Sequence, residues 1–187
     1  MDFQQIIEKY YPEASALRDI LLVHSKGVAE LAMQIVDAHP HLNANRDMVF
    51  QGAMLHDIGI IRCNAPGIEC YGTEPYIRHG VIGAEMLRKD CMLFGYTPEE
   101  IEPYARICER HTGTGLTKEA IITQNLPLPA HDFLPESIEE QIICYADKFF
   151  SKTHPEVRKP YEKAEKSLRK FGDDCVAKLQ EWHRLFA

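Results

Sequence analysis

The sequence of 187 residues lacks any apolar run long enough to cross a membrane, and its opening, Met1-Asp2-Phe3-Gln4-Gln5, lacks the basic and apolar pattern of a signal peptide. It also lacks an excess of positive charge: 21 lysines and arginines face 28 aspartates and glutamates, for a formal net charge of -7 at pH 7. That balance argues against coating nucleic acid or anionic membranes, although it permits a locally positive cleft. We therefore expect a soluble, cytoplasmic protein that has neither nucleic acid nor a membrane as its partner.

The six cysteines include no Cys-x-x-Cys pair, so a common type of zinc or redox motif is missing. Several of them, such as Cys108 and Cys144, lie in apolar stretches, which predicts buried, reduced thiols. Cys63 and Cys70 could be assigned to a zinc site, but their spacing matches no familiar structural zinc pattern. We interpret the cysteines as ordinary core residues.

The sequence also lacks a persistent alternation of apolar and polar residues and any internal repeat, which disfavours a large sheet or a repeat fold. Apolar residues instead recur at helical spacing and predict helices over residues 13–38, 47–57 and 77–89. Two capping boxes, Thr97-Pro98-Glu99-Glu100 and Ser137-Ile138-Glu139-Glu140, predict the starts of two further helices. A chain of this length can bury a substantial core. We predict an all-α fold with one domain over the whole chain.

Three segments depart from the pattern of apolar helices. Residues 62–76 are rich in glycine and proline and predict a loop that forms the lid or rim of a cleft. Residues 126–135 contain three prolines and predict an extended surface segment. Residues 156–187 are highly charged with few apolar positions, so we expect helices that cover the rest of the domain or form a homodimer surface.

The stretch Met54-Leu55-His56-Asp57-Ile58-Gly59-Ile60 ends an apolar run with an imidazole beside a carboxylate, a suitable floor for a metal site. The pair alone proves little, because a second pair, His131-Asp132, occurs elsewhere in the chain. We do not expect the second pair to bind metal, since it lies in the proline-rich segment, where no rigid element presents it. Further candidate ligands lie in other helical segments: His24, His79, His111 and Asp147. A single histidine on an apolar helix face is usually a core residue with a satisfied hydrogen bond. Only the combination indicates a site.

The order His24, His56-Asp57, Asp147 resembles the signature of the HD-domain metal-dependent phosphohydrolase superfamily. Three phrases carry the resemblance: Val23-His24-Ser25-Lys26-Gly27-Val28-Ala29, Leu55-His56-Asp57-Ile58-Gly59, and Tyr145-Ala146-Asp147-Lys148. Two more histidines stand in Arg78-His79-Gly80 and Glu109-Arg110-His111-Thr112-Gly113. They resemble the branch with a two-metal centre, which includes HD-type hydrolases that cut diadenosine tetraphosphate symmetrically. The resemblance implies an HD core over about residues 20–150 of a single domain, 1–187, with a helical cover over about 156–187.

The resemblance also implies a set of metal ligands. Asp57 would bridge two divalent transition-metal ions, with His24, His56 and Asp147 completing the shell of one ion and His79 and His111 holding the other. Imidazoles and carboxylates without a thiolate suit iron or manganese first, with zinc, cobalt, nickel or magnesium as alternatives. Two such ions activate a bridging water and clamp the attacking and leaving oxygens of phosphoryl transfer.

We predict Asp57 and Lys148 as catalytic residues. Positively charged side chains near the ligands, and the turn after His111, would hold substrate oxygens. The predicted substrate-binding residues are Lys26, Arg78, Arg110, Thr112 and Gly113. A charged residue beside a ligand frequently just faces water, which is the alternative for each of these cations.

The predicted function is hydrolysis of a phosphate ester or anhydride in a small phosphorylated substrate, a nucleotide above all. No sequence element selects adenine. The chain lacks the Gly-Tyr-Pro motif of cyclic di-GMP phosphodiesterases, so these rank lower. The alternative is a nucleotide-binding or regulatory HD domain with a metal site and little turnover.

Overall fold

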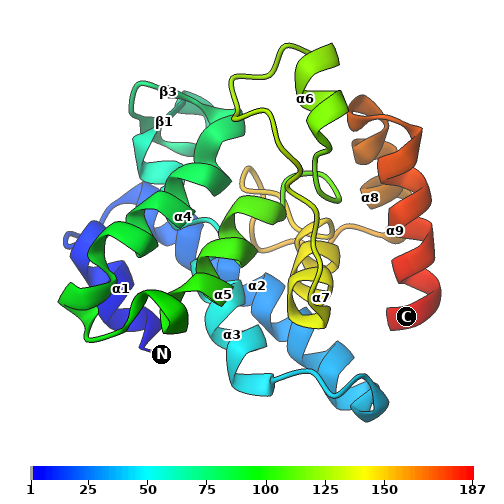
Figure 1. The fold of residues 1–187 in the computed structure, drawn as a ribbon, viewed down its shortest axis with the longest axis horizontal. Helices are drawn as coiled ribbons and strands as arrows, with labels where there is room; N and C mark the ends of the chain where they lie inside the picture. Colours follow the sequence, from blue (N-terminus) through cyan, green and yellow to red (C-terminus); the bar gives the residue numbers. More distant parts are fainter. Residues whose placement is uncertain (1) are drawn as a thin grey trace.

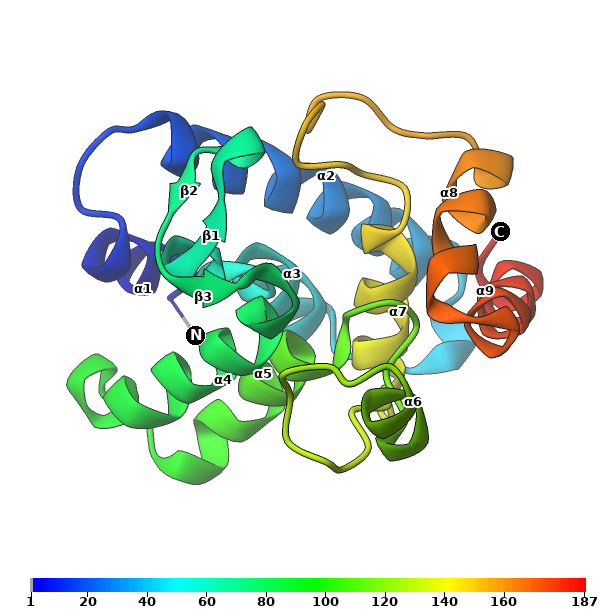
Figure 2. The ribbon, with the colours of Figure 1, turned by 90° about the horizontal axis from the view of Figure 1, so that it is seen from above.

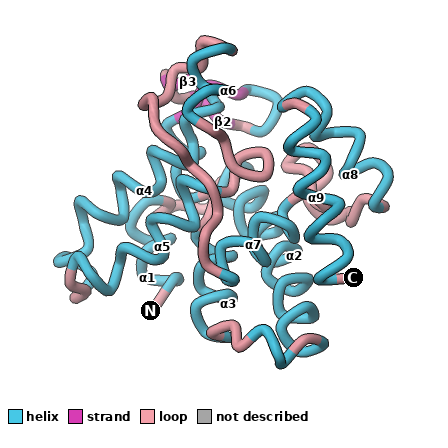
Figure 3. The backbone as a smooth tube through the Cα atoms, turned by 45° about the vertical axis from the view of Figure 1, so that its right-hand side comes forward, coloured by secondary structure: helices cyan, strands magenta, loops and turns pink. Residues whose placement is uncertain are grey.

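The computed structural model describes residues 2–187, and helices dominate them, which confirms the predicted all-α fold (Figures 1 and 3). The α-helices in this part of the chain are α1 (Phe3–Tyr10), α2 (Ala16–Ala38), α3 (Arg46–Leu55), α4 (His79–Asp90), α5 (Pro98–Arg110), α6 (Lys118–Thr123), α7 (Ile138–Asp147), α8 (Tyr161–Leu168) and α9 (Asp173–Phe186). Short 3-10 helices include η2 (Ile58–Arg62), η3 (Pro66–Ile68), η4 (Tyr76–Arg78) and η5 (Cys91–Phe94). Within residues 2–187, no helix is both long and apolar enough to span a membrane.

Capping side chains fix where the helices begin. The Ser15 side chain accepts a hydrogen bond from the amide of Arg18, so α2 begins three residues later than predicted. Asn45 caps α3 in the same way, and this helix ends at Leu55, before the His-Asp pair. Thr97 forms the predicted capping box of α5 with Glu100. For the helices whose ranges were predicted, the differences are confined to the ends, whereas α1 and α6 were not predicted.

Most of the core belongs to two apolar clusters that meet at α2, and a third, smaller cluster includes Leu116 and Phe133. One cluster includes Leu21, together with side chains of α1, α4 and α5. The other includes Val28, together with side chains of α3, α7 and α9. His24 lies one turn from each of these residues, since helix positions three and four apart share a face. A polar side chain is therefore buried at the junction of the clusters.

Residues 62–76 contain a small sheet that the sequence did not predict. Its strands are β1 (Cys63–Ala65), β2 (Cys70–Tyr71) and β3 (Glu74–Pro75), in the order β2-β1-β3. β1 pairs antiparallel with β2 and parallel with β3. Strands of two or three residues are too short to show an alternating pattern. Cys63 and Cys70 are buried free thiols here, as are the other four cysteines.

Residues 156–187 form the C-terminal helices α8 and α9. α8 and α9 pack against each other, and α9 also contacts α7 (Figure 2). Leu179 and Trp182 of α9 are completely buried in the cluster that includes Val28. The proline-rich stretch of residues 126–135 follows α6 without regular structure, and its Phe133 forms an isolated antiparallel bridge with Leu116.

Candidate metal centre

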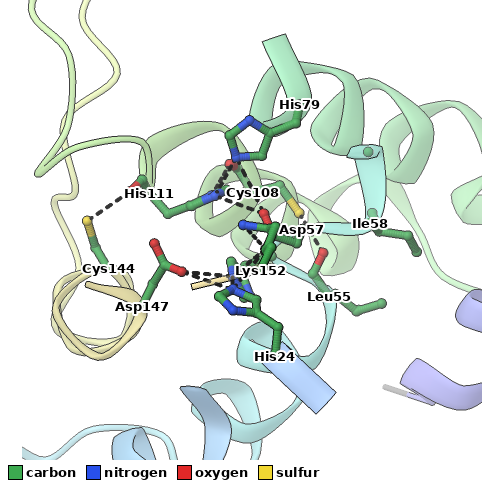
Figure 4. A network of polar contacts seen from close by, with 12 residues as sticks. His24, Leu55, Asp57, Ile58, His79, Cys108, His111, Cys144, Asp147 and Lys152 are labelled. Carbon is green, nitrogen blue, oxygen red and sulfur yellow. Dashed lines mark hydrogen bonds and ion pairs between the residues drawn. The ribbon is translucent and has the colours of Figure 1, made fainter. Parts of the chain in front are cut away.

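The predicted ligands are delivered by the ends of several helices and the middle of another. His56 and Asp57 follow α3, His79 begins α4, His111 follows α5 and Asp147 ends α7. His24 lies in the middle of α2. Figure 4 shows Asp57 in the centre, with His79 on one side and His24 on the other. The structure thus brings together six side chains that are up to 123 positions apart in the sequence.

Gly59 permits the close approach of η2 to α4 that the centre requires. A Cβ atom at this position would lie 2.1 Å from the carbonyl oxygen of His79 and 2.5 Å from the amide nitrogen of Gly83. These contacts involve backbone atoms, which cannot move aside as a side chain can. Only glycine lets the segment after Asp57 pass so near the first turn of α4.

The Asp57 carboxylate faces two groups of donors with its two oxygens. Oδ2 lies 3.0 Å from Nε2 of His24 and 3.1 Å from Nε2 of His56. Asp147 joins this group through Oδ1, which lies 3.1 Å from Nε2 of His24. The four residues of this group offer donor atoms within 4.8 Å of one another.

The other oxygen of Asp57 faces the second group. Oδ1 lies 3.4 Å from Nε2 of His79 and 3.3 Å from Nε2 of His111. Asp57, His79 and His111 also offer donor atoms within 4.8 Å of one another. The carboxylate is therefore shared between two clusters, which is the arrangement that a bridging ligand requires.

Three of the imidazoles are oriented by the same backbone contact. Nδ1 of His56 donates to the carbonyl of Ala53 at 2.7 Å, and Nδ1 of His79 donates to that of Tyr76 at 2.7 Å. Nδ1 of His111 likewise donates to the carbonyl three residues earlier, at 2.6 Å. Each bond fixes the ring and leaves Nε2 facing Asp57, the usual orientation of a metal-binding histidine.

The donor chemistry fits divalent metal ions. Nε2 of His79 lies 2.9 Å from Nε2 of His111, and Nε2 of His24 lies 3.3 Å from Nε2 of His56. Paired ring nitrogens need a proton or a cation between them, since two lone pairs repel. Both buried oxygens of Asp57 also face these nitrogens, at 3.0 to 3.4 Å. The cluster therefore has the buried, converging donors of a metal site, and the identity of the metal stays a prediction.

The electrostatics of the centre keep most donors in the form that binds metal. Burial raises the pKa of Asp57, but His56 and Lys152 outweigh it and hold the pKa well below its ordinary value. Burial, together with neighbouring His111, lowers the pKa of His79 to about 3. Burial also lowers the pKa of His56, but Asp57 and Asp147 raise it to about 9. Metal binding must therefore release a proton from His56.

Two lysines lie at the centre, and the sequence indicated only one of them. Lys148 Nζ contacts Oδ2 of Asp147 at 2.8 Å and donates to the carbonyl of His111 at 2.8 Å. Lys152 Nζ contacts Oδ2 of Asp57 at 2.6 Å. The turn after α7 brings Lys152 back over the centre, and no local sequence pattern signals such a return.

A cavity of about 710 Å³ opens over the centre. His79, His111 and Asp147 line its floor, and the predicted substrate-binding pair Thr112 and Gly113 lies beside them. One side is formed within residues 65–77, the rim predicted from the sequence, and the other within residues 147–171. In Figures 1 and 2, the segment between α7 and α8 lies between the small sheet and α8.

The structure does not bring the three cations among the predicted substrate-binding residues, Lys26, Arg78 and Arg110, to this cavity. Lys26 is 73% exposed and faces Glu30, because it lies two positions after His24 and so points away from the centre. Arg78 pairs with Glu74 at 2.5 Å. Arg110 contacts Glu136 at 3.1 Å and donates to the carbonyl of Leu134 at 2.9 Å. These guanidinium groups hold neighbouring segments together.

The second His-Asp pair lies away from the centre, as the sequence predicted. Asp132 accepts a hydrogen bond from the amide of Lys118 at 2.7 Å, near the start of α6. His131 is exposed and packs against the ring of Phe133. The pair is part of a surface turn.

The fold and the donor set define an HD domain. The HD domain family matches residues 21–151, so the chain belongs to this family. The predicted membership of the superfamily is confirmed, and the narrower similarity to diadenosine tetraphosphate hydrolases stays a prediction.

Three archaeal relatives extend the comparison. An uncharacterized protein of Methanocaldococcus jannaschii is 37% identical over 150 residues, which cover 79% of this chain and 76% of the relative. A tRNA (cytidine(56)-2'-O)-methyltransferase of Picrophilus torridus is 36% identical over 133 residues, or 71% of this chain and 32% of the relative. The corresponding methyltransferase of Thermoplasma volcanium is 31% identical over 170 residues, or 90% of this chain and 42% of the relative. The chain spans less than half the length of both methyltransferases.

Solved structures show the same fold. The HD domain of the Listeria monocytogenes phosphodiesterase PgpH superposes with a TM-score of 0.52 and 19% identity, covering 96% of this chain and 93% of that one. The same domain in complex with cyclic-di-AMP also gives a TM-score of 0.52 at 19% identity, covering 97% and 94%. At this identity the likeness concerns the fold.

Proposed function

We propose that the chain is a metal-dependent phosphohydrolase that cleaves a phosphate ester or anhydride of a small, nucleotide-type substrate. The observation that carries the proposal is the position of Asp57, whose two oxygens face separate clusters of buried imidazole and carboxylate donors. His24, His56 and Asp147 would hold one divalent ion and His79 and His111 the other. When bound, such ions supply Lewis acidity and an activated water.

The protein's own residues would orient the donors and the substrate. Lys148 contacts both Asp147 and the carbonyl of His111, so we assign it a positioning role at the metal ligands. Lys152 lines the cavity beside Asp57 and would supply positive charge for the transferred phosphoryl group. Thr112 and Gly113 line the cavity beside His111, where their backbone could hold a phosphate oxygen.

The experiment is elemental analysis of the purified protein together with a substrate panel. The panel contains bis(4-nitrophenyl) phosphate, nucleotides, dinucleoside polyphosphates and cyclic dinucleotides, with chelator-treated protein as the control. We expect bound divalent metal, turnover of at least one compound, and loss of that turnover after chelation. Equal turnover in the metal-free protein would contradict the proposal.

The names of two relatives motivate a second candidate, a domain that binds RNA or a nucleotide without hydrolysing it. The chain matches only 32% and 42% of those tRNA methyltransferases, so their named activity belongs to proteins with additional sequence. Tight metal binding without turnover of the panel, combined with tRNA binding, would favour this candidate.

A further inference from the structure

One side of the cavity carries an excess of positive charge that contrasts with the whole chain. Residues 148–170 contain eight lysines and arginines but only three glutamates, whereas the full chain has a net charge of -7. Four of these lysines line the cavity: Lys148, Lys152, Lys159 and Lys170. A concentration of one charge sign in a cleft attracts a ligand of the opposite sign.

The four lysines fall into two pairs with different partners. Lys148 contacts Asp147 and Lys152 contacts Asp57, so the metal ligands already engage both ammonium groups. Lys159 and Lys170 make no ion pair with a carboxylate within residues 2–187, although both face the cavity. The second pair is therefore available to an anion from outside the chain.

The surroundings of Lys159 make an external anion favourable. Burial lowers its pKa; Asp147 opposes that effect, while Lys148, Lys152 and Lys170 lower the pKa further. A partly buried ammonium group beside other cations is poorly stabilised unless an anion approaches it. A phosphate group there would relieve the repulsion and form charge-assisted hydrogen bonds.

We infer that Lys159 and Lys170 form a second phosphate subsite, so that the substrate carries at least two phosphate groups. One phosphate would lie at the metal centre and the other at this lysine pair. The inference rests on the proposed function, because it assigns the first phosphate to that centre. The cavity of about 710 Å³ is of the size that encloses a small organic ligand. Its apolar lining, which includes Ile68, Phe150 and Phe171, suits the remainder of such a molecule.

The test is a comparison of binding constants by calorimetry with the metal-loaded, full-length chain. The ligands are AMP, adenosine 5'-(α,β-methylene)diphosphate, whose phosphates are linked, and adenosine 3',5'-bisphosphate, whose phosphates are separate. The test variant is Lys159→Gln with Lys170→Gln. The matched control is Lys163→Gln with Lys166→Gln, which removes the same charge from exposed positions of α8 outside the cavity.

We expect the wild type to bind one of the two bisphosphorylated ligands at least about tenfold more tightly than AMP, because a charge-assisted hydrogen bond contributes about 1.5–3 kcal/mol. The test variant should lose most of this preference, and the control should keep it. The preferred ligand shows whether the two phosphates are linked or separate. Equal binding of all three ligands, or a preference that survives in the test variant, would overturn the subsite.

Two further measurements distinguish failure of this inference from failure of the proposed function, and a small ligand from RNA. Turnover of the substrate panel by the wild type tests the proposed function, and the absence of turnover with every compound would sink that function without affecting the calorimetric comparison. A single-stranded RNA oligonucleotide that binds more tightly than the small ligands, and depends on Lys159 and Lys170, would overturn the assignment to a small molecule.

Discussion

The floor and the wall of the cavity are built in different ways. By the floor we mean the metal centre below the cavity, with its six candidate ligands His24, His56, Asp57, His79, His111 and Asp147, which lie in or next to helices and are almost completely buried. The wall is the segment of residues 148–171, which consists of turns and short helices and includes exposed lysines. We infer that the floor sets the chemistry and that the wall selects the substrate.

The largest effect should follow from a change in the floor. Asp57→Asn removes the charge from the carboxylate shared by both clusters, so we expect the metal content to fall and turnover to drop by on the order of 10³-fold or more. Elemental analysis and the rate with the preferred panel substrate measure both. The matched control is Asp132→Asn in the second His-Asp pair, which should leave metal content and rate at the wild-type level. Unchanged metal content in Asp57→Asn would show that the carboxylate is not a ligand.

Gly59→Ala should destabilise the protein strongly, because its Cβ would meet backbone atoms of His79 and Gly83 at 2.1 and 2.5 Å. We expect the free energy of unfolding to fall by about 3 kcal/mol, the upper end for overpacking of a core. Gly67→Ala is the control, since a Cβ there meets no atom within 4 Å. Urea denaturation of both variants measures the difference. A loss as small as that of the control would mean that η2 and α4 can separate.

Lys152 connects the two regions, since it belongs to the wall and contacts Asp57 of the floor at 2.6 Å. Without metal, Lys152→Met leaves the buried Asp57 carboxylate without this cation, and we expect a loss of about 3 kcal/mol. Bound metal supplies replacement charge, so the loss should shrink when Mn²⁺ is present. Thermal unfolding with and without Mn²⁺ tests this, with Lys163→Met on exposed α8 as the control. An equal loss of stability with and without Mn²⁺ would show that bound metal does not replace the charge of Lys152.

The floor could be predicted because the order of His24, His56-Asp57 and Asp147 resembles the HD-domain signature. Helical spacing and residue type alone were not sufficient, since a single histidine on an apolar helix face is usually a core residue. The position of Lys152 could not be predicted, because it depends on how the turn after α7 returns over the centre. The prediction for Lys26 gave weight to proximity in sequence, but two positions along a helix place a side chain on the opposite face.

The smallest effect tests whether the wall can rearrange more easily than the floor. A Cβ at Gly27 of α2 would lie 2.7 Å from the ring of Phe150, a side chain of the wall that can rotate away. Because alanine also favours the helix by about 1 kcal/mol, we expect Gly27→Ala to change the free energy of unfolding by less than about 1 kcal/mol. The same substitution at Gly52 meets Ile107 and Ile143 of the core at 2.5 and 3.0 Å and should be more costly. Urea denaturation should therefore rank Gly27→Ala below Gly52→Ala and Gly59→Ala. If Gly27→Ala were as destabilising as Gly59→Ala, the wall would be as rigid as the floor. The inference that an adaptable wall selects the substrate would then be wrong.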